Sequence, residues 1–320
     1  MTSLRPESLP PASILGVGAV TPLGRGLDAI AAKLAEWERA PARILRVDDE
    51  WLLDPALSRP LRRADRFTRM AAMAALEAWN ASEADRVGVP LERIGMIVSS
   101  GFGPHCRGFR FLDGILDCGD SAASPTDFSH SVHGAASAYI SGLLGLRGPS
   151  LNVTDFEIGF EEVVRLAQCW LAEGACDRVL IGAMEELGEV MLDCASKMLG
   201  DFPCYSPGEG AVFLMLGPSS LPALVRVDAA AEPRSVDLLI VDEPPLPGGA
   251  ECAPAVCARR TTSFGHRLGQ SASGAAFELL GGILAMRANS RGEAAVDNAA
   301  TFRTSSDART ATLLLTRGEP

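Results

Sequence analysis

The sequence predicts an α/β protein, because strand-like apolar runs alternate with amphipathic helical stretches along the chain. The strand-like runs are mostly continuous rather than alternating, as expected for sheets that are covered on both faces. A similar rhythm occurs in residues 1–217 and again in residues 218–320, without visible sequence identity between the two parts. We therefore expect two halves built on one plan.

The first half is the longer one. Its strand candidates lie at 13–20, 94–100, 151–156, 178–184 and 210–216. Helical spacing of apolar residues, or a run of alanine and other small residues, predicts helices at 27–37, 66–79, 134–146 and 160–173. Gly174 is the expected stop signal of the last of these helices.

The second half repeats the alternation over fewer residues. Strand candidates lie at 223–229, 237–242 and 310–316, with a helix over roughly 270–287. The stretches 200–209 and 244–255 are rich in Gly and Pro, so they are expected to be irregular connections.

Composition excludes several classes of function. A formal net charge of -11 and a pI of 4.9 argue against binding to nucleic acid or to an anionic membrane. Apolar runs are too short for a transmembrane helix, and the N-terminus has no signal-peptide core, so we expect a cytoplasmic protein. The eight cysteines form no CxxC pair and no zinc-type spacing with histidine, so no metal, no disulfide and no cofactor is expected.

One turn, "LNVTDFEIGF" (151–160), stands where a strand runs directly into a helix. Such a turn commonly carries a nucleophile, because the helix N-terminus favours developing negative charge. The residue at the turn is Glu157, with no Ser or Cys beside it. Taken alone, Glu157 is either a general acid or a first-turn carboxylate that interacts favourably with the helix dipole.

Five segments, in this order, resemble the β-ketoacyl synthases of the thiolase superfamily. They are "ILGVGAVTPLG", "VHGAASAYISGLLGLRGPSLNV", "CDRVLIGAMEE", "SPGEGAVFLML" and "SFGHRLGQSASGAAFELLGGILAM". The resemblance covers most of the chain. It implies a thiolase-like fold with two pseudo-repeated halves in αβαβα layers, an N-terminal half at 1–217 and a reduced C-terminal half at 218–320. It also implies a dimer built along the strand before the nucleophile.

The catalytic residues of that family are largely missing. The resemblance puts Glu157 at the cysteine that would carry the acyl group, and a carboxylate cannot hold a transferable thioester. His266 matches the second histidine, whereas Glu243 lies near the position of the lost first histidine and Thr261 replaces the expected lysine. The glycine-rich turn that supplies an oxyanion-hole amide is replaced by "TFRTSSDART".

This combination of a kept scaffold and a lost site resembles the chain length factor, the ketosynthase-like subunit of type II polyketide synthases. The compact chain is similar to the factors of polyene-forming, highly reducing systems. The resemblance implies no condensing activity, a heterodimer with a ketosynthase α subunit, and contact with acyl carrier protein mainly through that partner. The alternatives are a malonyl-carrier-protein decarboxylase that uses Glu157 and His266, and a divergent homodimeric synthase with a relocated nucleophile.

The resemblance also implies roles for apolar side chains. Residues after the "SSG" strand end would close or shape an acyl tunnel that enters from the partner: Phe109, Phe111, Leu112, Ile115 and Leu116. A second group would lie at the dimer interface: Phe128, His133, Leu151, Val153, Asp155 and Phe156.

Overall fold

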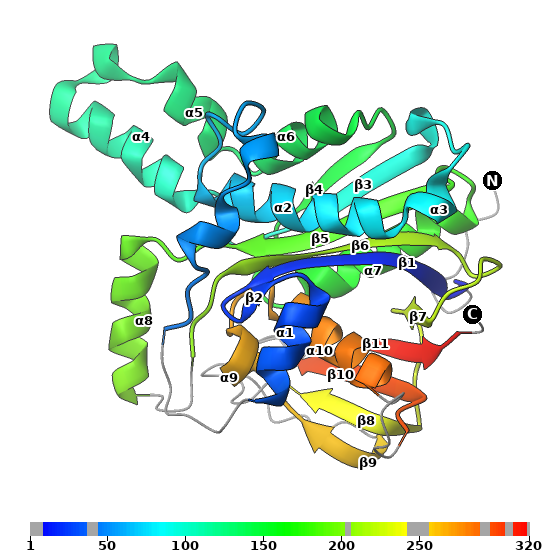
Figure 1. The fold of residues 1–320 in the computed structure, drawn as a ribbon. Coiled ribbons are helices and arrows are strands. Elements are labelled where there is room, and N and C mark those ends of the chain that lie inside the picture. Colours follow the sequence, from blue (N-terminus) through cyan, green and yellow to red (C-terminus); the bar gives the residue numbers. More distant parts are fainter. Residues whose placement is uncertain are drawn as a thin grey trace.

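A computed structural model describes residues 9–36, 44–201, 206–241, 256–288, 295–304 and 310–318. The fold is a mixed α/β arrangement around a large twisted sheet (Figure 1). No helix in these ranges is long and apolar enough to cross a membrane.

The first half contributes five strands to the sheet: β1 (Ala12–Thr21), β3 (Ile94–Ser99), β4 (Ser150–Val153), β5 (Arg178–Glu185) and β6 (Gly210–Pro218). Their order is β4-β3-β5-β6-β1. β3 runs parallel to β4 and β5, whereas β6 runs antiparallel to β5 and β1. The short β2 (Gly24–Arg25) pairs with the end of β1.

The second half repeats this topology with β7 (Val225–Asp228), β8 (Ser235–Val241), β9 (Cys257–Thr262), β10 (Asn298–Thr304) and β11 (Thr310–Arg317). Read from the edge, the order β9-β8-β10-β11-β7 matches β4-β3-β5-β6-β1 strand for strand. Parallel and antiparallel pairs fall at equivalent places. A short antiparallel pairing of β1 with β7 joins the halves, so two copies of one plan form the thiolase-like fold.

Helices separate and cover the two halves of the sheet. α2 (Arg66–Ala81) and α6 (Ala135–Leu144) pack on the outer face of the first half. α7 (Gly159–Ala172) and α10 (Gly274–Ala288) lie between the halves and share one apolar core with strands of both. These layers follow the predicted order (Figure 1). The described residues include no helix on the outer face of the second half, where the fifth layer was expected.

Close packing explains the alanine-rich sequence of α2. A side chain on Gly16 of β1 would place its Cβ 2.3 Å from the Ala78 carbonyl oxygen, and one on Gly18 would lie 2.1 Å from the Ala74 carbonyl oxygen. The helix therefore lies almost directly on the backbone of β1. Only small residues on both surfaces allow that approach.

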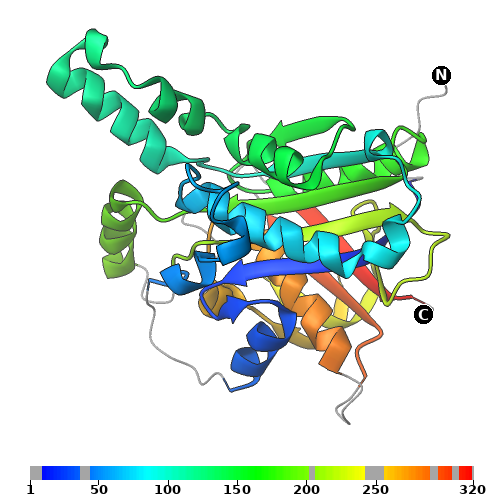
Figure 2. The ribbon, with the colours of Figure 1, turned by 45° about the horizontal axis from the view of Figure 1, so that its top comes forward.

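Other elements connect or project from these layers. α1 (Leu27–Ala35), α3 (Glu83–Arg86), α9 (Gly265–Leu268) and the 3₁₀ turns η2 (Asp49–Leu52), η3 (Pro55–Leu57) and η4 (Leu91–Arg93) are short. α4 (His105–Cys118), η5 (Asp120–Ala122) and α5 (Pro125–Ser131) form an arm that extends away from the body (Figures 1 and 2). α8 (Glu189–Asp201) stands beside the body below that arm (Figure 1).

Every strand and helix predicted above has a counterpart, with small differences at the ends. The helix expected at 270–287 begins at Gly274, and the strand expected to reach residue 156 ends at Val153. The prediction of an irregular connection at 200–209 was wrong at its start, because residues 200–201 are the last residues of α8. The stretch 244–255 lies outside the described residues. Sequence patterns did not reveal α8, β9 or β10.

Candidate functional site

The turn between β4 and α7 is held by a side chain that sequence analysis assigned to an interface. Asp155 Oδ1 accepts the backbone N–H groups of Glu157 and Ile158, each at 2.8 Å. These N–H groups lie at the start of α7. The first N–H groups of a helix have no partner within the helix, so they would otherwise be available to a ligand. Glu157 is half-buried, and its backbone N–H is already hydrogen-bonded to Asp155.

A buried arginine from the second half braces the same turn. Arg303 of β10 is 8% exposed, and its Nη1 donates to the carbonyl oxygen of Glu157 at 2.9 Å and to that of Ala272 at 3.4 Å. Its Nη2 lies so close to Gly274 that a Cβ there would be 2.4 Å away. The guanidinium group thus fills the space between the turn and the start of α10.

The other predicted site residues that the structure describes lie on different elements of the second half. His266 is half-buried on α9, and Arg267 Nε donates to its Nε2 at 3.3 Å. Thr261 is exposed on β9, an edge strand of the sheet, where it pairs in register with Leu239. Glu243 lies outside the described residues.

Glu185, at the end of β5, is a buried group that sequence analysis missed. It accepts the backbone N–H groups of Gly101 and of Phe102, the latter at 3.4 Å, and the hydroxyl of Ser273 at 3.1 Å. Burial raises the pKa of Glu185 to about 7, against the opposing effect of these hydrogen bonds. The adjacent Glu186 also has a pKa raised to about 7, first by burial. The two consecutive glutamates at the end of a buried strand were the sequence feature that could have indicated these buried carboxyl groups.

A small cavity opens beside these carboxyl groups. Its volume is about 70 Å³, whereas drug-sized ligands occupy pockets of roughly 300–1,000 Å³. A long acyl chain therefore does not fit inside this cavity. The cavity is lined by Phe102, Leu187, Met191, Cys194 and Ala272, together with Glu185, Glu186, Pro207, Gly208, Gln270 and Ser271.

The predicted tunnel residues do not line this cavity. They lie on α4, a helix without a buried residue, and three are exposed: Phe109, Leu112 and Leu116. Leu116 is 81% exposed. Phe111 and Ile115 are half-buried, and the Phe111 ring contacts the Phe128 ring with centroids 5.5 Å apart. The aromatic residue at the cavity is instead Phe102, whose ring lies 5.0 Å from that of Phe156.

The predicted interface residues gather on one exposed region. β4 is an edge strand, and Leu151 on it is exposed while Val153 is half-buried. Phe128 and Phe156 are 56% and 55% exposed. His133 is also exposed, whereas Asp155 is half-buried as the cap described above. Exposed apolar side chains therefore occur on the arm, on β4 and at the turn before α7.

Comparisons with known proteins agree with this fold. The family model described as "Beta-ketoacyl synthase, N-terminal domain" matches residues 35–194, half of the chain. A 3-oxoacyl-[acyl-carrier-protein] synthase 2 of Coxiella burnetii (strain RSA 493 / Nine Mile phase I) is 25% identical over 186 residues. That match covers 54% of this chain and 45% of the relative, so the chain spans less than half of that protein.

Solved structures match over nearly the whole chain, at identities that support the fold alone. The ishigamide ketosynthase/chain length factor has a TM-score of 0.75 and 17% identity, over 97% of this chain and 100% of that one. The type II polyketide ketosynthase in the AntDE:AntF complex with its acyl-carrier protein also has a TM-score of 0.75 and 17% identity, over 96% and 99%. A β-ketoacyl synthase from Burkholderia phymatum STM815 has a TM-score of 0.73 and 15% identity, over 97% and 100%.

Proposed function

The chain belongs to the β-ketoacyl synthase N-terminal domain family, and we propose that it is a non-catalytic chain length factor that pairs with an active ketosynthase. The observation that carries the proposal is the turn at Glu157. A carboxylate stands where an acyl-carrying nucleophile would be, and the N–H of the same residue is bonded to Asp155. Both parts of a condensing site, nucleophile and oxyanion donor, are thereby lost together.

The arginine beneath the turn supports the same conclusion. In a condensing enzyme the space behind the nucleophile turn must admit a thioester and its developing negative charge. In this chain the buried Arg303 occupies that space and is bonded to two backbone carbonyl groups. We infer that the site has been converted into a packed junction between the two halves, which we place at residues 1–217 and 218–320.

The expected partner is a ketosynthase subunit of the same fold. β4 offers unpaired backbone groups at the sheet edge, which another strand can extend. The arm adds exposed apolar side chains, such as Phe128 and Leu116, next to it. A surface of this kind marks a protein interface, and an obligate one buries more than ~2,000 Å² in total.

The apolar side chains of α4 would then border a tunnel that belongs to the pair. The cavity of about 70 Å³ in this chain is too small for a polyketide, so chain length would be limited where Phe109 and Leu112 meet the partner. The net charge of -11 on this chain supports contact with an acidic carrier protein mainly through the partner subunit. A polyene-type product and a cytoplasmic location belong to the same proposal.

The alternative function is a malonyl-carrier-protein decarboxylase that uses Glu157 and His266. The half-buried His266 near the start of the second half favours it, because a histidine can stabilise charge on a thioester carbonyl. The occupied amide at Glu157 counts against it.

Co-expression separates the two functions. The chain is produced alone and with the ketosynthase encoded beside it, and the products are examined by size exclusion and by a malonyl-carrier-protein decarboxylation assay. A 1:1 complex, with decarboxylation unaffected by Glu157→Ala, supports the chain length factor. A stable homodimer whose decarboxylation is abolished by Glu157→Ala refutes it.

Matched surface variants test the interface. Leu116→Ser with Phe128→Ser is expected to weaken the 1:1 complex at least about tenfold, since large side chains at an interface centre dominate binding. Val87→Ser, which removes an equally exposed side chain from the end of α3, should leave association unchanged. In the intact complex, Phe109→Ala and Leu112→Ala should lengthen the product. Unchanged product length in both would remove the tunnel role without removing the heterodimer.

A further inference from the structure

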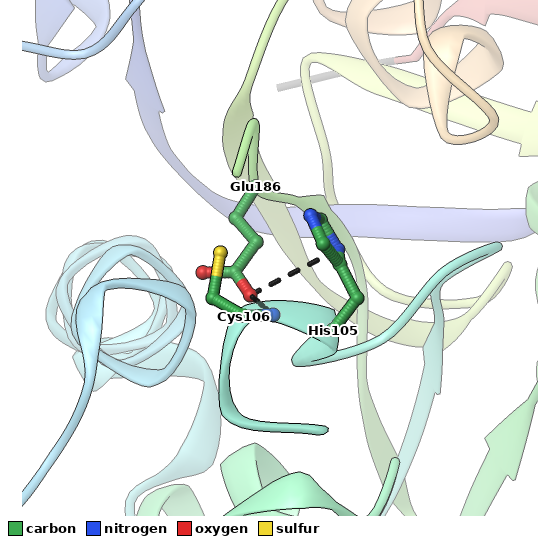
Figure 3. A group of neighbouring side chains, drawn as sticks. All are labelled: His105, Cys106 and Glu186. Atoms are coloured by element: carbon green, nitrogen blue, oxygen red, sulfur yellow. Dashed lines mark hydrogen bonds and ion pairs between the residues drawn. The ribbon is translucent and has the colours of Figure 1, made fainter. Parts of the chain in front are cut away.

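Three side chains with metal-binding atoms converge at the root of the arm (Figure 3). His105 and Cys106 lie on the first turn of α4, and Glu186 directly follows β5. One ligand atom from each lies within 4.8 Å of the other two. Sequence spacing predicted no metal site, because the third residue is far away along the chain and reaches the pair only through the fold.

The histidine is oriented as metal-binding histidines commonly are. His105 Nδ1 lies 3.3 Å from the carbonyl oxygen of Gly103, which fixes the proton on that nitrogen. Nε2 is then the basic nitrogen, and it accepts the Gly188 N–H at 3.2 Å. A backbone carbonyl at one ring nitrogen, with the lone pair on the other nitrogen, is the arrangement that second-shell partners impose on a ligating imidazole. A metal would have to displace the Gly188 hydrogen bond to Nε2 and the hydrogen bond between the Cys106 and Glu186 side chains.

Gly188 keeps the space between the thiol and the imidazole open. A Cβ at this position would lie 2.3 Å from Cys106 Sγ and 2.9 Å from His105 Nε2, so both ligand atoms face the same point. No other residue type could stand here without pushing them apart. The cysteine is a free thiol with an exposed side, which leaves an entry route for an ion.

The carboxylate completes the set from the other side. Glu186 Oε1 accepts the Cys106 backbone N–H at 3.0 Å and lies 3.9 Å from His105 Nδ1, so the carboxylate must shift toward Nε2 to share an ion with that nitrogen. Bond lengths of about 2.0–2.3 Å place donors roughly 3.3–3.8 Å apart in a tetrahedral zinc site, so closing the present spacing needs movements of only about 1 Å. Asp65 Oδ2, which is buried without a hydrogen bond, adds negative charge nearby, partly balanced by Arg107 at 3.6 Å.

We propose that His105, Cys106 and Glu186 bind one Zn²⁺ ion. A thiolate, an imidazole and a carboxylate are the ligand types that zinc accepts, and a water molecule would take the fourth position. Binding releases the thiol proton to solvent and forms a zinc–sulfur bond without any change of oxidation state. The ion would tie the first turn of α4 to the end of β5 and so fix the direction in which the arm leaves the body.

The test uses the full chain, freed of metal by a chelator and then titrated with Zn²⁺ or with Co²⁺. We expect one ion per chain and, with Co²⁺, the near-ultraviolet charge-transfer absorption of a thiolate ligand. Cys106→Ser should lower the affinity more than about tenfold and abolish that absorption. Cys118→Ser, at the exposed far end of the same helix, should change neither.

Two further variants keep the result interpretable. Gly188→Ala keeps all three ligand residues but fills the space between Cys106 Sγ and His105 Nε2, so it should also reduce binding. Glu186→Gln removes the charge and keeps the shape. Each variant is compared with the unsubstituted chain by far-ultraviolet circular dichroism before titration. Absence of stoichiometric binding to the folded chain, or unchanged affinity in folded Cys106→Ser, overturns the proposal. Neither result bears on the chain length factor function.

Discussion

Replacement of Arg303 tests whether the space between the Glu157 turn and the start of α10 is a packed structural junction. The side chain is 8% exposed and bonded to the carbonyl oxygens of Glu157 and Ala272. Arg303→Met keeps much of the aliphatic volume but removes both donors. Each buried carbonyl that loses its partner costs about 1–3 kcal/mol. Because the second bond is long, at 3.4 Å, we expect a total loss of about 2–4 kcal/mol.

A thermal unfolding series measures this loss. About 2 °C of melting temperature per kcal/mol is appropriate for a chain of this size, so Arg303→Met should melt roughly 4–8 °C lower. Arg303→Lys keeps a positive charge and one potential donor. Its melting temperature should therefore lie between those of Arg303→Met and the unsubstituted chain. The variant should acquire no condensing activity, since neither a nucleophile nor a free amide is restored.

Arg317 provides a matched control. It lies on β11, the strand paired with β10, and it also donates to two backbone carbonyl groups, those of Met286 and Val296. Its side chain is 36% exposed, so water can replace the lost donors and Arg317→Met should cost only about 1 kcal/mol. Equal losses in the two variants, or an Arg303→Met loss below about 1 kcal/mol, would refute the reasoning.

Three further predictions concern the scaffold. Glu209 is fully buried and accepts hydrogen bonds from an arginine of α2 and from backbone N–H groups. Glu209→Gln should therefore lower the free energy of unfolding by about 3–5 kcal/mol, as measured by thermal melting. A change below about 1 kcal/mol would contradict this prediction. Gly208→Ala would put a Cβ 2.3 Å from Gly269 Cα and should abolish soluble expression, whereas Gly108→Ala, with open space around it, should express normally. Burial raises the pKa of Glu77, so the folded chain holds this proton more tightly than the unfolded chain. The free energy of unfolding should therefore fall as pH rises above the ordinary glutamate range, and this fall should be smaller in Glu77→Gln. Parallel plots of stability against pH for the two chains would disprove this prediction.

Local patterns account for what was predictable from sequence. Strands such as β5 and β6 are buried on both faces, so their continuous apolar runs were unambiguous. α7 carries its apolar residues at helical spacing and stops beside Gly174. The turn at Glu157 was also located, because a strand followed directly by a helix leaves few alternatives for where the chain reverses.

Long-range pairing accounts for what was missed. β10 reads "NAATFRT", with little apolar content, and it is a strand because it pairs with β8 and β11 on its two sides. Sequence patterns also did not reveal that Asp155 accepts the backbone N–H groups of Glu157 and Ile158, because this bond depends on the turn geometry. Glu185 meets Gly101 only when β3 pairs with β5 in the folded sheet, so no spacing rule could connect them. Tertiary contacts of this kind override local propensity.

Phe156 links the cavity to the exposed edge. Phe156 is 55% exposed, and its ring lies 5.0 Å from that of Phe102, which lines the cavity. A partner that covers β4 would therefore also cover a wall of the cavity. Phe156→Ala in the complex should weaken association and change product length together, whereas Leu116→Ser, far from the cavity on the arm, should weaken association alone. Size exclusion and product mass measure the two effects separately, and a Phe156→Ala complex with normal affinity and normal product would show that the edge and the cavity act independently.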